Sequence, residues 1–409
     1  MQIYPVNFLK LFLVHNMVRF RPLRAASPSR AFARAVVFVL VSLLAGFSSL
    51  LSAAPLPAPP QLSANSFLLI DTISGEVLAE KNPDERIEPA SLTKLMTAYL
   101  VASEIKAGTI LETDLAIISD FAQSMPGSRM FIEAGKTVSI GELMRGLIIQ
   151  SGNDASVALA EHVAASEQGF VSMMNRMAET LGMNNTNFMN ASGLPDPDHY
   201  TTARDLAIIS RRMIQDFPEH YALYSQRSFT YNNIKQNNRN KLLWRDDSVD
   251  GMKTGHTEAA GYCLVASAVR DNMRLISIVL GTASDKTRMA ESQRLLNYGF
   301  RFFKTERIYE AGEVISEAKI WMGKSEQIPL GVAEDLYVTL PRDAFDTLHS
   351  QIELSSYIKA PARIGQELGR SVLTADDQVI GEVPLLALQK VEEGSILVRM
   401  KHSILRYFQ

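Results

Sequence analysis

Three short polar strings follow one another in a fixed order along this chain. They are Ser91-Leu92-Thr93-Lys94, Ser151-Gly152-Asn153 and Lys253-Thr254-Gly255, and the second and third each occur once. A serine followed three residues later by a lysine is too short a pattern to be specific by itself. It occurs four times, beginning at Ser91, Ser103, Ser316 and Ser356, and only the first two of these serines precede both other strings.

The surrounding sequence favours Ser91 over Ser103 as the reactive serine. Glu88-Pro89-Ala90 ends a polar loop, and apolar residues then recur at helical spacing, which predicts that a helix begins at Ser91. Residues three apart share a helix face, so the Lys94 amine is expected beside the Ser91 hydroxyl. The start of a helix also offers unpaired N–H groups to a developing oxyanion. Ser103 lies near a helix end instead, because Gly108 follows soon after it.

Five side chains are expected to carry catalysis: Ser91, Lys94, Ser151, Asn153 and Lys253. A serine hydroxyl becomes a good nucleophile only when a neighbouring group removes its proton. Lys94 can do so as a neutral amine, which requires its pKa to fall from about 10.4 to about 7, a change worth about 4 kcal/mol. Burial and the nearby cation of Lys253 both act in that direction.

The remaining groups of the strings suit proton relay and charge stabilisation. Ser151 is expected to pass a proton to the leaving group, and Asn153 to orient Lys94 and the substrate amide. The backbone N–H groups of Ser91 and His256 are expected to form an oxyanion hole, in which one donor is typically worth about 3–4 kcal/mol.

Length and charge limit the classes of protein to consider. The chain has 409 residues and a formal net charge of −3, a globular composition with room for two domains and no sign of a nucleic-acid partner. The single cysteine, Cys263, cannot form an intramolecular disulfide. The histidines show no metal-ligand spacing, so neither a metal nor another cofactor is expected.

Residues 1–54 are typical of a secretory signal region. Arginines between Arg19 and Arg34 precede an apolar run from Ala35 to Leu51, and small residues and prolines follow. Basic, then apolar, then small residues is the order of an export signal. The alternative is an uncleaved anchor, because the prolines that follow blur the cleavage site.

The remainder reads as an α+β arrangement. Two strands near the N-terminal end and several after Ser228 enclose a largely helical middle, which predicts an antiparallel sheet with a helical subdomain over residues 62–304. Short alternating segments predict a small β-rich domain over residues 305–391. No catalytic string falls inside that second domain.

The last segment, residues 395–409, predicts an amphipathic helix. Its apolar arc is formed by Ile396, Leu397, Met400, Ile404, Tyr407 and Phe408, opposite Arg399, His402, Ser403 and Arg406. About 15 residues fall short of the roughly 20 needed to span a bilayer, so on a membrane this helix would lie in the interface. The alternative is a terminal helix packed on its own domain.

With these strings in this order, residues 62–409 resemble the low-molecular-mass penicillin-binding proteins that act as D-alanyl-D-alanine carboxypeptidases. The resemblance includes Pro89 to Thr97, Gln150 to Ala155, Asn238 to Asn240 and Val249 to Thr257. It implies a fold like the serine β-lactamases and DD-peptidases, and cleavage of peptidoglycan stem peptides ending in D-Ala-D-Ala. It also implies acylation by β-lactam antibiotics, and a periplasmic location with the C-terminal helix on the outer face of the inner membrane.

The same resemblance implies the residues that bind substrate: Thr254, Gly255, His256, Thr257, Arg288 and Arg239. Arg288 is expected to hold the substrate's terminal carboxylate together with Thr254 and Thr257, because a guanidinium matches a carboxylate with two parallel hydrogen bonds. Arg239 corresponds to a position near the entrance of the active site. A surface ion pair is the alternative role for Arg239.

Three rival functions share parts of this pattern. A β-lactamase of class A would also need a glutamate that activates a deacylating water, and the stretch from Met183 to Tyr200 contains none. A non-catalytic peptidoglycan-binding scaffold would not need all five catalytic side chains. Endopeptidase action on cross-links needs the same residues as carboxypeptidase action, so the sequence leaves it open.

Overall fold

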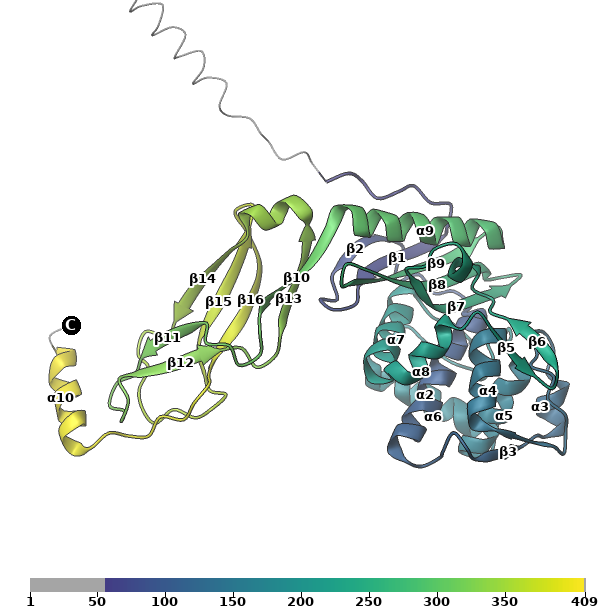
Figure 1. Cartoon of the computed structure of the whole chain (residues 1–409), viewed down its shortest axis with the longest axis horizontal. Helices are drawn as coiled ribbons and strands as arrows, with labels where there is room; N and C mark the ends of the chain where they lie inside the picture. Colours follow the sequence, from purple (N-terminus) through teal and green to yellow (C-terminus); the bar gives the residue numbers. More distant parts are fainter. Residues whose placement is uncertain (1–55, 408–409) are drawn as a thin grey trace, which may run out of the picture. The chain divides into compact units, whose positions relative to one another are not determined.

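The computed structural model describes residues 56–407, with side chains as far as Leu405. The predicted signal region, residues 1–54, lies outside the described residues. Helices and antiparallel sheets combine in an α+β fold that includes a helical part, a β-rich C-terminal part and a final helix, as the sequence predicted (Figure 1).

Five antiparallel strands form the central sheet, in the spatial order β2-β1-β9-β8-β7. Strands that precede the helical part therefore pair with strands that follow it. A two-residue turn at Asp271-Asn272, with positive φ at both residues, joins β8 to β9 as a hairpin. The strands are β1 (Ser66–Asp71), β2 (Val77–Lys81), β7 (Val249–Thr257), β8 (Gly261–Arg270) and β9 (Met273–Thr282).

Alternate residues of this sheet face two different hydrophobic cores. Leu68 packs among the helices on one face, whereas its neighbour Leu69 packs in the core that α9 (Asp285–Phe302) covers on the other (Figure 1). The start of α9 is fixed by Ser284, whose Oγ accepts the Thr287 N–H at 3.1 Å, the contact typical of a serine N-cap.

The helical part supplies the first two strings. It also contains two strands, β3 and β4, that the sequence did not predict, because three residues are too few to show an alternating pattern. Its elements are η1 (Ala90–Thr93), α2 (Lys94–Ala107), β3 (Leu115–Ile117), α3 (Asp120–Ser124), β4 (Thr137–Ser139), α4 (Ile140–Arg145), η2 (Gly146–Gln150), α5 (Asn153–Ala164), α6 (Glu167–Leu181), α7 (Ala203–Asp216), α8 (Pro218–Tyr221) and η3 (Ala222–Ser225). The chain returns to the sheet through β5 (Ser228–Tyr231), β6 (Ile234–Asn237) and η4 (Lys241–Trp244).

The C-terminal part is β-rich, with one five-stranded sheet in the order β11-β12-β16-β15-β14 and a separate pair, β10-β13. Its own core contains Ile328, Leu330 and Leu385. The elements are β10 (Phe303–Tyr309), β11 (Ser316–Lys319), β12 (Gln327–Gly331), β13 (Leu336–Pro341), η5 (Arg342–Thr347), β14 (His349–Leu354), β15 (Glu367–Ala375) and β16 (Gln378–Ala387).

The final helix, α10 (Ile396–Tyr407), exposes much of its predicted apolar arc. Leu397 is 79% exposed and Ile404 60%. His402 does not share the exposed polar face on which the sequence placed it: its Nδ1 accepts the Met322 N–H at 2.7 Å, and its ring meets Trp321 edge-on. No helix within residues 56–407 is long and apolar enough to cross a membrane.

Candidate active site

Ser91 lies in a short helical turn, η1, that leads directly into the buried helix α2. The Lys94 Nζ lies 3.0 Å from the Ser91 Oγ, as their spacing predicted. Strand β7 packs closely against this turn because Gly255 has no side chain. A Cβ at Gly255 would come within 3.1 Å of the Pro89 carbonyl oxygen. The third string therefore lies next to the first.

The Lys94 side chain is buried, and its amine has three hydrogen-bond partners. Asn153 Oδ1 lies at 2.7 Å and the Ser192 carbonyl oxygen at 2.5 Å, and both can only accept. The Ser91 hydroxyl can accept or donate. A neutral amine has two N–H bonds and one lone pair, so when both obligate acceptors are satisfied its lone pair faces the Ser91 hydroxyl.

The pKa values of both buried lysines, Lys94 and Lys253, are lowered. Burial lowers the pKa of Lys94 to about 7, although the Asp154 carboxylate acts against this. Burial, followed by the charges of Lys94 and Arg288, lowers the pKa of Lys253 well below its usual range. The sequence assigned part of the lowering at Lys94 to Lys253, whereas burial is the main cause in the structure.

Ser151 and Lys253 form a second hydroxyl–amine pair in the same site. Ser151 follows the π-helical turn η2 and has a left-handed backbone, with φ of 67°. Such single π turns occur frequently at functional sites. The Lys253 Nζ donates to the Ser151 Oγ at 2.7 Å and to the Thr254 carbonyl oxygen at 3.1 Å.

Asn153 and Asp154 begin α5 and hold one wall of the site. The Asn153 Nδ2 donates to the Pro126 carbonyl oxygen at 2.6 Å, which leaves Oδ1 to face Lys94. The buried Asp154 carboxylate accepts backbone N–H groups from the loop of residues 126–132. The second string is thereby tied directly to that loop.

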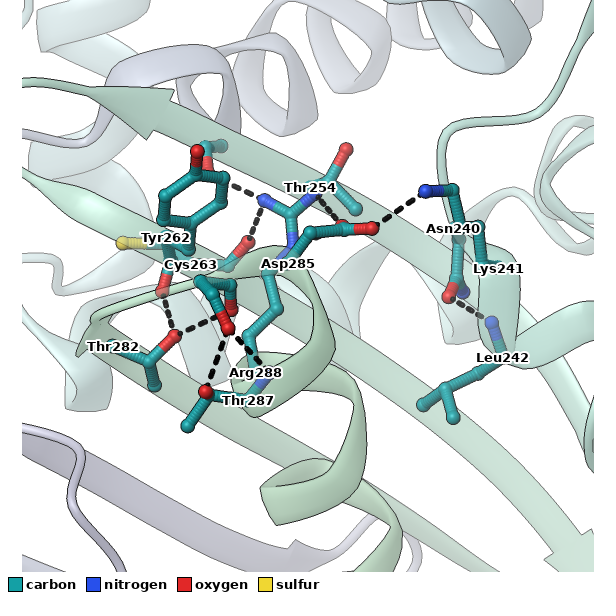
Figure 2. A network of polar contacts seen from close by, with 12 residues as sticks. Asn240, Lys241, Leu242, Thr254, Tyr262, Cys263, Thr282, Asp285, Thr287 and Arg288 are labelled. Carbon is teal, nitrogen blue, oxygen red and sulfur yellow. Dashed lines mark hydrogen bonds and ion pairs between the residues drawn. The ribbon is translucent and has the colours of Figure 1, made fainter.

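Arg288 is buried, and most of its donors are already engaged (Figure 2). Its Nη1 donates to the carbonyl oxygens of Gly255 at 2.8 Å and Cys263 at 3.1 Å. Its Nε and Nη2 both donate to Asp285 Oδ1, at 3.0 and 2.5 Å. In this arrangement the guanidinium lacks the two free parallel donors that a two-pronged carboxylate contact needs. It joins α9 to β7 and β8 and places positive charge at the groove.

The three strings meet along a groove of about 790 Å³. The predicted substrate-binding residues all line it: Thr254, Gly255, His256, Thr257, Arg288 and Arg239. Within this group the Thr257 hydroxyl donates to Glu88 Oε2 at 3.0 Å, so a substrate carboxylate would compete with Glu88 for it. The exposed His256 ring packs on Tyr262, with 4.0 Å between ring centroids.

Arg239 contacts the wall that the second string holds. Its guanidinium donates to the Gln150 carbonyl oxygen at 3.4 Å and to the Ser128 hydroxyl at 3.3 Å. It forms no ion pair with any residue in the described part of the chain, so the surface ion pair that the sequence left open is not found there.

Sequence reasoning did not single out Asp154 or the Ser192 carbonyl. The available signal for Asp154 was its place directly after Asn153. A backbone carbonyl leaves no sequence signal of its own. The neighbouring glycine, Gly193, was the available signal for the Ser192 carbonyl. Gly193 has φ of 84°, and a Cβ there would lie 1.8 Å from the Ala90 carbonyl oxygen, so glycine is needed to bring this loop to the Ser91 turn.

No group of three or more His, Cys, Asp and Glu side chains within residues 56–407 is arranged to hold a metal ion. The carboxylate that lines the groove, Asp285, is paired with Arg288 and Lys241.

Comparison with known proteins places this geometry in a family. Residues 53–284 match the family model described as D-alanyl-D-alanine carboxypeptidase, and residues 303–393 match the C-terminal domain of penicillin-binding protein 5. The chain is 44% identical over 348 residues to D-alanyl-D-alanine carboxypeptidase DacA of Escherichia coli, covering 83% of this chain and 86% of that protein.

Solved structures agree with the sequence matches. Penicillin-binding protein 5 of Haemophilus influenzae superposes with a TM-score of 0.80 at 43% identity, covering 82% of this chain and all of that one. Penicillin-binding protein D2 of Listeria monocytogenes, solved in its ampicillin-bound form, superposes with a TM-score of 0.55 at 31% identity and covers 60% of this chain and all of that one. The chain belongs to the D-alanyl-D-alanine carboxypeptidase family of serine peptidases.

Proposed function

We propose that this D-alanyl-D-alanine carboxypeptidase removes the terminal D-alanine from peptidoglycan stem peptides through an acyl-enzyme on Ser91. The observation that carries the proposal is the set of partners around Lys94. Two obligate acceptors, Asn153 Oδ1 and the Ser192 carbonyl, satisfy its N–H bonds, and Ser91 Oγ lies 3.0 Å away where the lone pair points. A pKa of about 7 makes the neutral amine abundant at neutral pH.

Acylation begins with transfer of the Ser91 hydroxyl proton to Lys94. The Ser91 Oγ then attacks the carbonyl carbon between the two D-alanines and forms a tetrahedral intermediate. The N–H groups of Ser91 and His256 are proposed to stabilise its oxyanion. The Ser151 hydroxyl donates a proton to the departing nitrogen, and the ammonium form of Lys253 reprotonates Ser151 across their 2.7 Å contact and becomes the neutral amine. Free D-alanine leaves, and water then hydrolyses the ester of Ser91.

The terminal carboxylate of the substrate is proposed to lie toward the cationic part of the groove. Thr254 lines that part, and Arg288 supplies a buried positive charge beneath it. Because Asp285 and two backbone carbonyl oxygens already occupy most Arg288 donors, its role here is chiefly electrostatic. Thr257 joins the carboxylate only if its hydroxyl leaves Glu88.

The direct test is release of free D-alanine from a soluble peptide that ends in D-Ala-D-Ala. The wild-type protein should release it, and Ser91→Ala should not. Ser103→Ala is the matched control, because Ser103 begins the same four-residue pattern and does not line the groove. Activity that persists in Ser91→Ala, or that is lost in Ser103→Ala, contradicts the assignment.

The same site is proposed to be acylated by penicillins and to release them slowly. A cyclic β-lactam amide presents a carbonyl and a carboxylate to the groups that receive D-Ala-D-Ala. Within the described residues, the carboxylate of the groove lining is Asp285, and its pairing with Arg288 and Lys241 leaves it poorly suited to activate a deacylating water. A β-lactamase is therefore not favoured. Ser91 should retain fluorescent penicillin, and rapid release of the label would contradict this.

We infer a signal region over residues 1–54, a catalytic domain over 62–304, a β-rich domain over 305–391 and a membrane-binding helix over 395–409. The exposed apolar side chains of α10 support the last of these. The mature protein would then work in the periplasm, peripheral on the outer face of the inner membrane.

A further inference from the structure

The loop between α6 and α7 brings one backbone peptide group, the one that joins Ser192 to Gly193, into contact with Lys94. The carbonyl oxygen of this group accepts from the Lys94 Nζ at 2.5 Å. Its N–H, which belongs to Gly193, donates to the Asn190 Oδ1 at 2.7 Å. In a planar trans peptide group the N–H and the C=O point in opposite directions. A contact that holds the N–H therefore also sets the direction of the carbonyl.

The Asn190 side chain closes this stretch of the loop on itself. Besides the Gly193 N–H, its Oδ1 accepts the N–H groups of Ser192 at 3.2 Å and of Leu194 at 3.1 Å. Its Nδ2 donates to the Leu194 carbonyl oxygen at 3.0 Å. Asparagine is suited to this task because its short amide can bond the backbone a few residues away. Gly193 and Leu194 line the groove, whereas Asn190 does not, so Asn190 would act on the reaction without touching substrate.

Ala191, which lies between Asn190 and Ser192, is held separately. Its N–H donates to Glu167 Oε1 on α6 at 2.9 Å, and its carbonyl oxygen accepts from the Thr97 hydroxyl on α2 at 2.7 Å. These contacts attach the loop to two helices but leave the next peptide group free to rotate. Within residues 56–407 the Gly193 N–H has Asn190 Oδ1 as its one hydrogen-bond partner. Asn190 is thus the group that opposes this rotation.

We propose that Asn190 is a positioning residue for acylation: through the Ser192–Gly193 peptide group it directs an acceptor at the Lys94 amine and so aims the Lys94 lone pair at Ser91. The inference rests on the proposed function. Without the Ser192 carbonyl, a neutral Lys94 amine would keep one obligate acceptor, Asn153 Oδ1, and its lone pair could turn away from the Ser91 hydroxyl. The same carbonyl stabilises the ammonium form, so its loss should lower the pKa of Lys94 further.

The test follows the rate of Ser91 acylation by a fluorescent penicillin in rapid mixing from pH 5 to 9. The wild-type rate should rise to a plateau with its midpoint at about pH 7. Asn190→Ala should lower the plateau rate by about tenfold to a hundredfold, because the base is no longer aligned with the nucleophile. Its midpoint should move to lower pH, because the ammonium form of Lys94 has lost an acceptor.

The conservative variant Asn190→Asp should behave differently. It keeps an oxygen that accepts the Gly193 N–H, so it should retain most of the plateau rate. It also places a negative charge on the peptide group that contacts Lys94, which favours the ammonium form and should move the midpoint to higher pH. Opposite midpoint shifts in the two variants would not arise from simple loosening of the loop. If Asn190→Ala fails to fold, the upward shift in Asn190→Asp still tests the proposal.

Asn175→Ala is the matched control for loss of an asparagine that holds the same loop. Asn175, on α6, accepts the Phe188 N–H through Oδ1 at 2.8 Å and donates to the Phe188 carbonyl oxygen through Nδ2 at 2.9 Å. Its removal should destabilise the loop without changing a contact of the Ser192–Gly193 peptide group, so the midpoint should stay at the wild-type value. A midpoint shift equal to that of Asn190→Ala would contradict a specific role for Asn190.

The outcomes separate the two proposals. A wild-type protein that penicillin does not acylate overturns the proposed function and the positioning role with it. A wild-type protein that is acylated, combined with wild-type plateau rates and midpoints in both Asn190 variants, overturns the positioning role alone.

Discussion

The Lys253 Nζ lies 2.7 Å from the Ser151 Oγ, in the same site where Lys94 lies 3.0 Å from the Ser91 Oγ. Each buried lysine is thus paired with one hydroxyl. Both lysine pKa values are lowered, chiefly by burial. A lowered pKa favours the neutral amine at Lys94, which can accept the Ser91 proton, and makes the Lys253 ammonium a stronger acid, which can supply a proton to Ser151.

If Ser151 and Lys253 act in one relay, their substitutions should not be additive. Ser151→Ala and Lys253→Met should each lower the rate of penicillin acylation by about 10²–10⁴-fold, and the double variant should be little worse than either. Acylation rates from a fluorescent penicillin form the double-mutant cycle. Independent, multiplying losses would show that the two residues act at separate steps.

The acylation rate should depend on pH through Lys94. Because the neutral amine is the reactive form, the rate should be low at acidic pH and rise through about pH 7, where burial places the pKa. Lys94→Arg should be nearly as inactive as Lys94→Ala, since a guanidinium stays charged at working pH. Rapid-mixing acylation from pH 5 to 9 checks both points. A flat profile, or an active Lys94→Arg, would count against a lysine base.

Arg288→Ala should affect both stability and substrate preference. The change leaves the Gly255 and Cys263 carbonyl oxygens without this donor and removes one partner of Asp285. Asp285 is 30% exposed, so the main loss is at the two carbonyl oxygens, and leaving buried acceptors without a donor typically costs about 1–3 kcal/mol of unfolding free energy. Denaturant unfolding measures that loss. Asp285 still keeps Lys241 as an ion-pair partner in this variant.

The same Arg288 variant tests the electrostatic role in binding. Comparing free-acid and amidated peptides should show that Arg288→Ala loses most of the preference for the free acid. Arg288→Lys is the control that retains a positive charge, so it should retain much of that preference. If Arg288→Lys loses as much as Arg288→Ala, guanidinium geometry rather than charge holds the carboxylate.

Local patterns predicted much of the fold and the central site. The contact between Ser91 and Lys94 follows from helical spacing, and the N-cap of α9 follows from Ser284. Both depend on residues within one turn of each other, where sequence distance fixes spatial distance. The α+β class followed from hydrophobic patterning around the two sets of strands.

Contacts between distant segments were harder to predict. The Ser192 carbonyl reaches Lys94 only because Gly193 allows its loop to approach Ala90, and no periodic pattern records that approach. The engagement of Arg288 by Gly255 and Cys263 carbonyl oxygens depends on how α9 packs on the sheet. The sequence shows that such a residue is charged, but it does not show which of its N–H donors remain free to bind a substrate.

Membrane binding by α10 should depend on its exposed apolar side chains. His402 anchors the helix to Met322 and Trp321, so deleting the helix would also expose a buried contact. Point substitutions on the exposed arc are therefore cleaner. Replacing Leu397 and Ile404 together with aspartate should release the protein from vesicles that contain anionic lipid.

Burying one such side chain contributes about 1.5–3 kcal/mol, so losing two should weaken binding by at least about a hundredfold. Vesicle co-sedimentation measures the bound fraction, and activity on a small soluble peptide should stay unchanged because neither residue lines the groove. Ser403→Asp is the matched control, since it adds a negative charge to the same helix outside the apolar arc. Equal release by Ser403→Asp would show that charge alone governs binding, and vesicle binding that persists in the double variant would show that α10 does not hold the protein to the membrane.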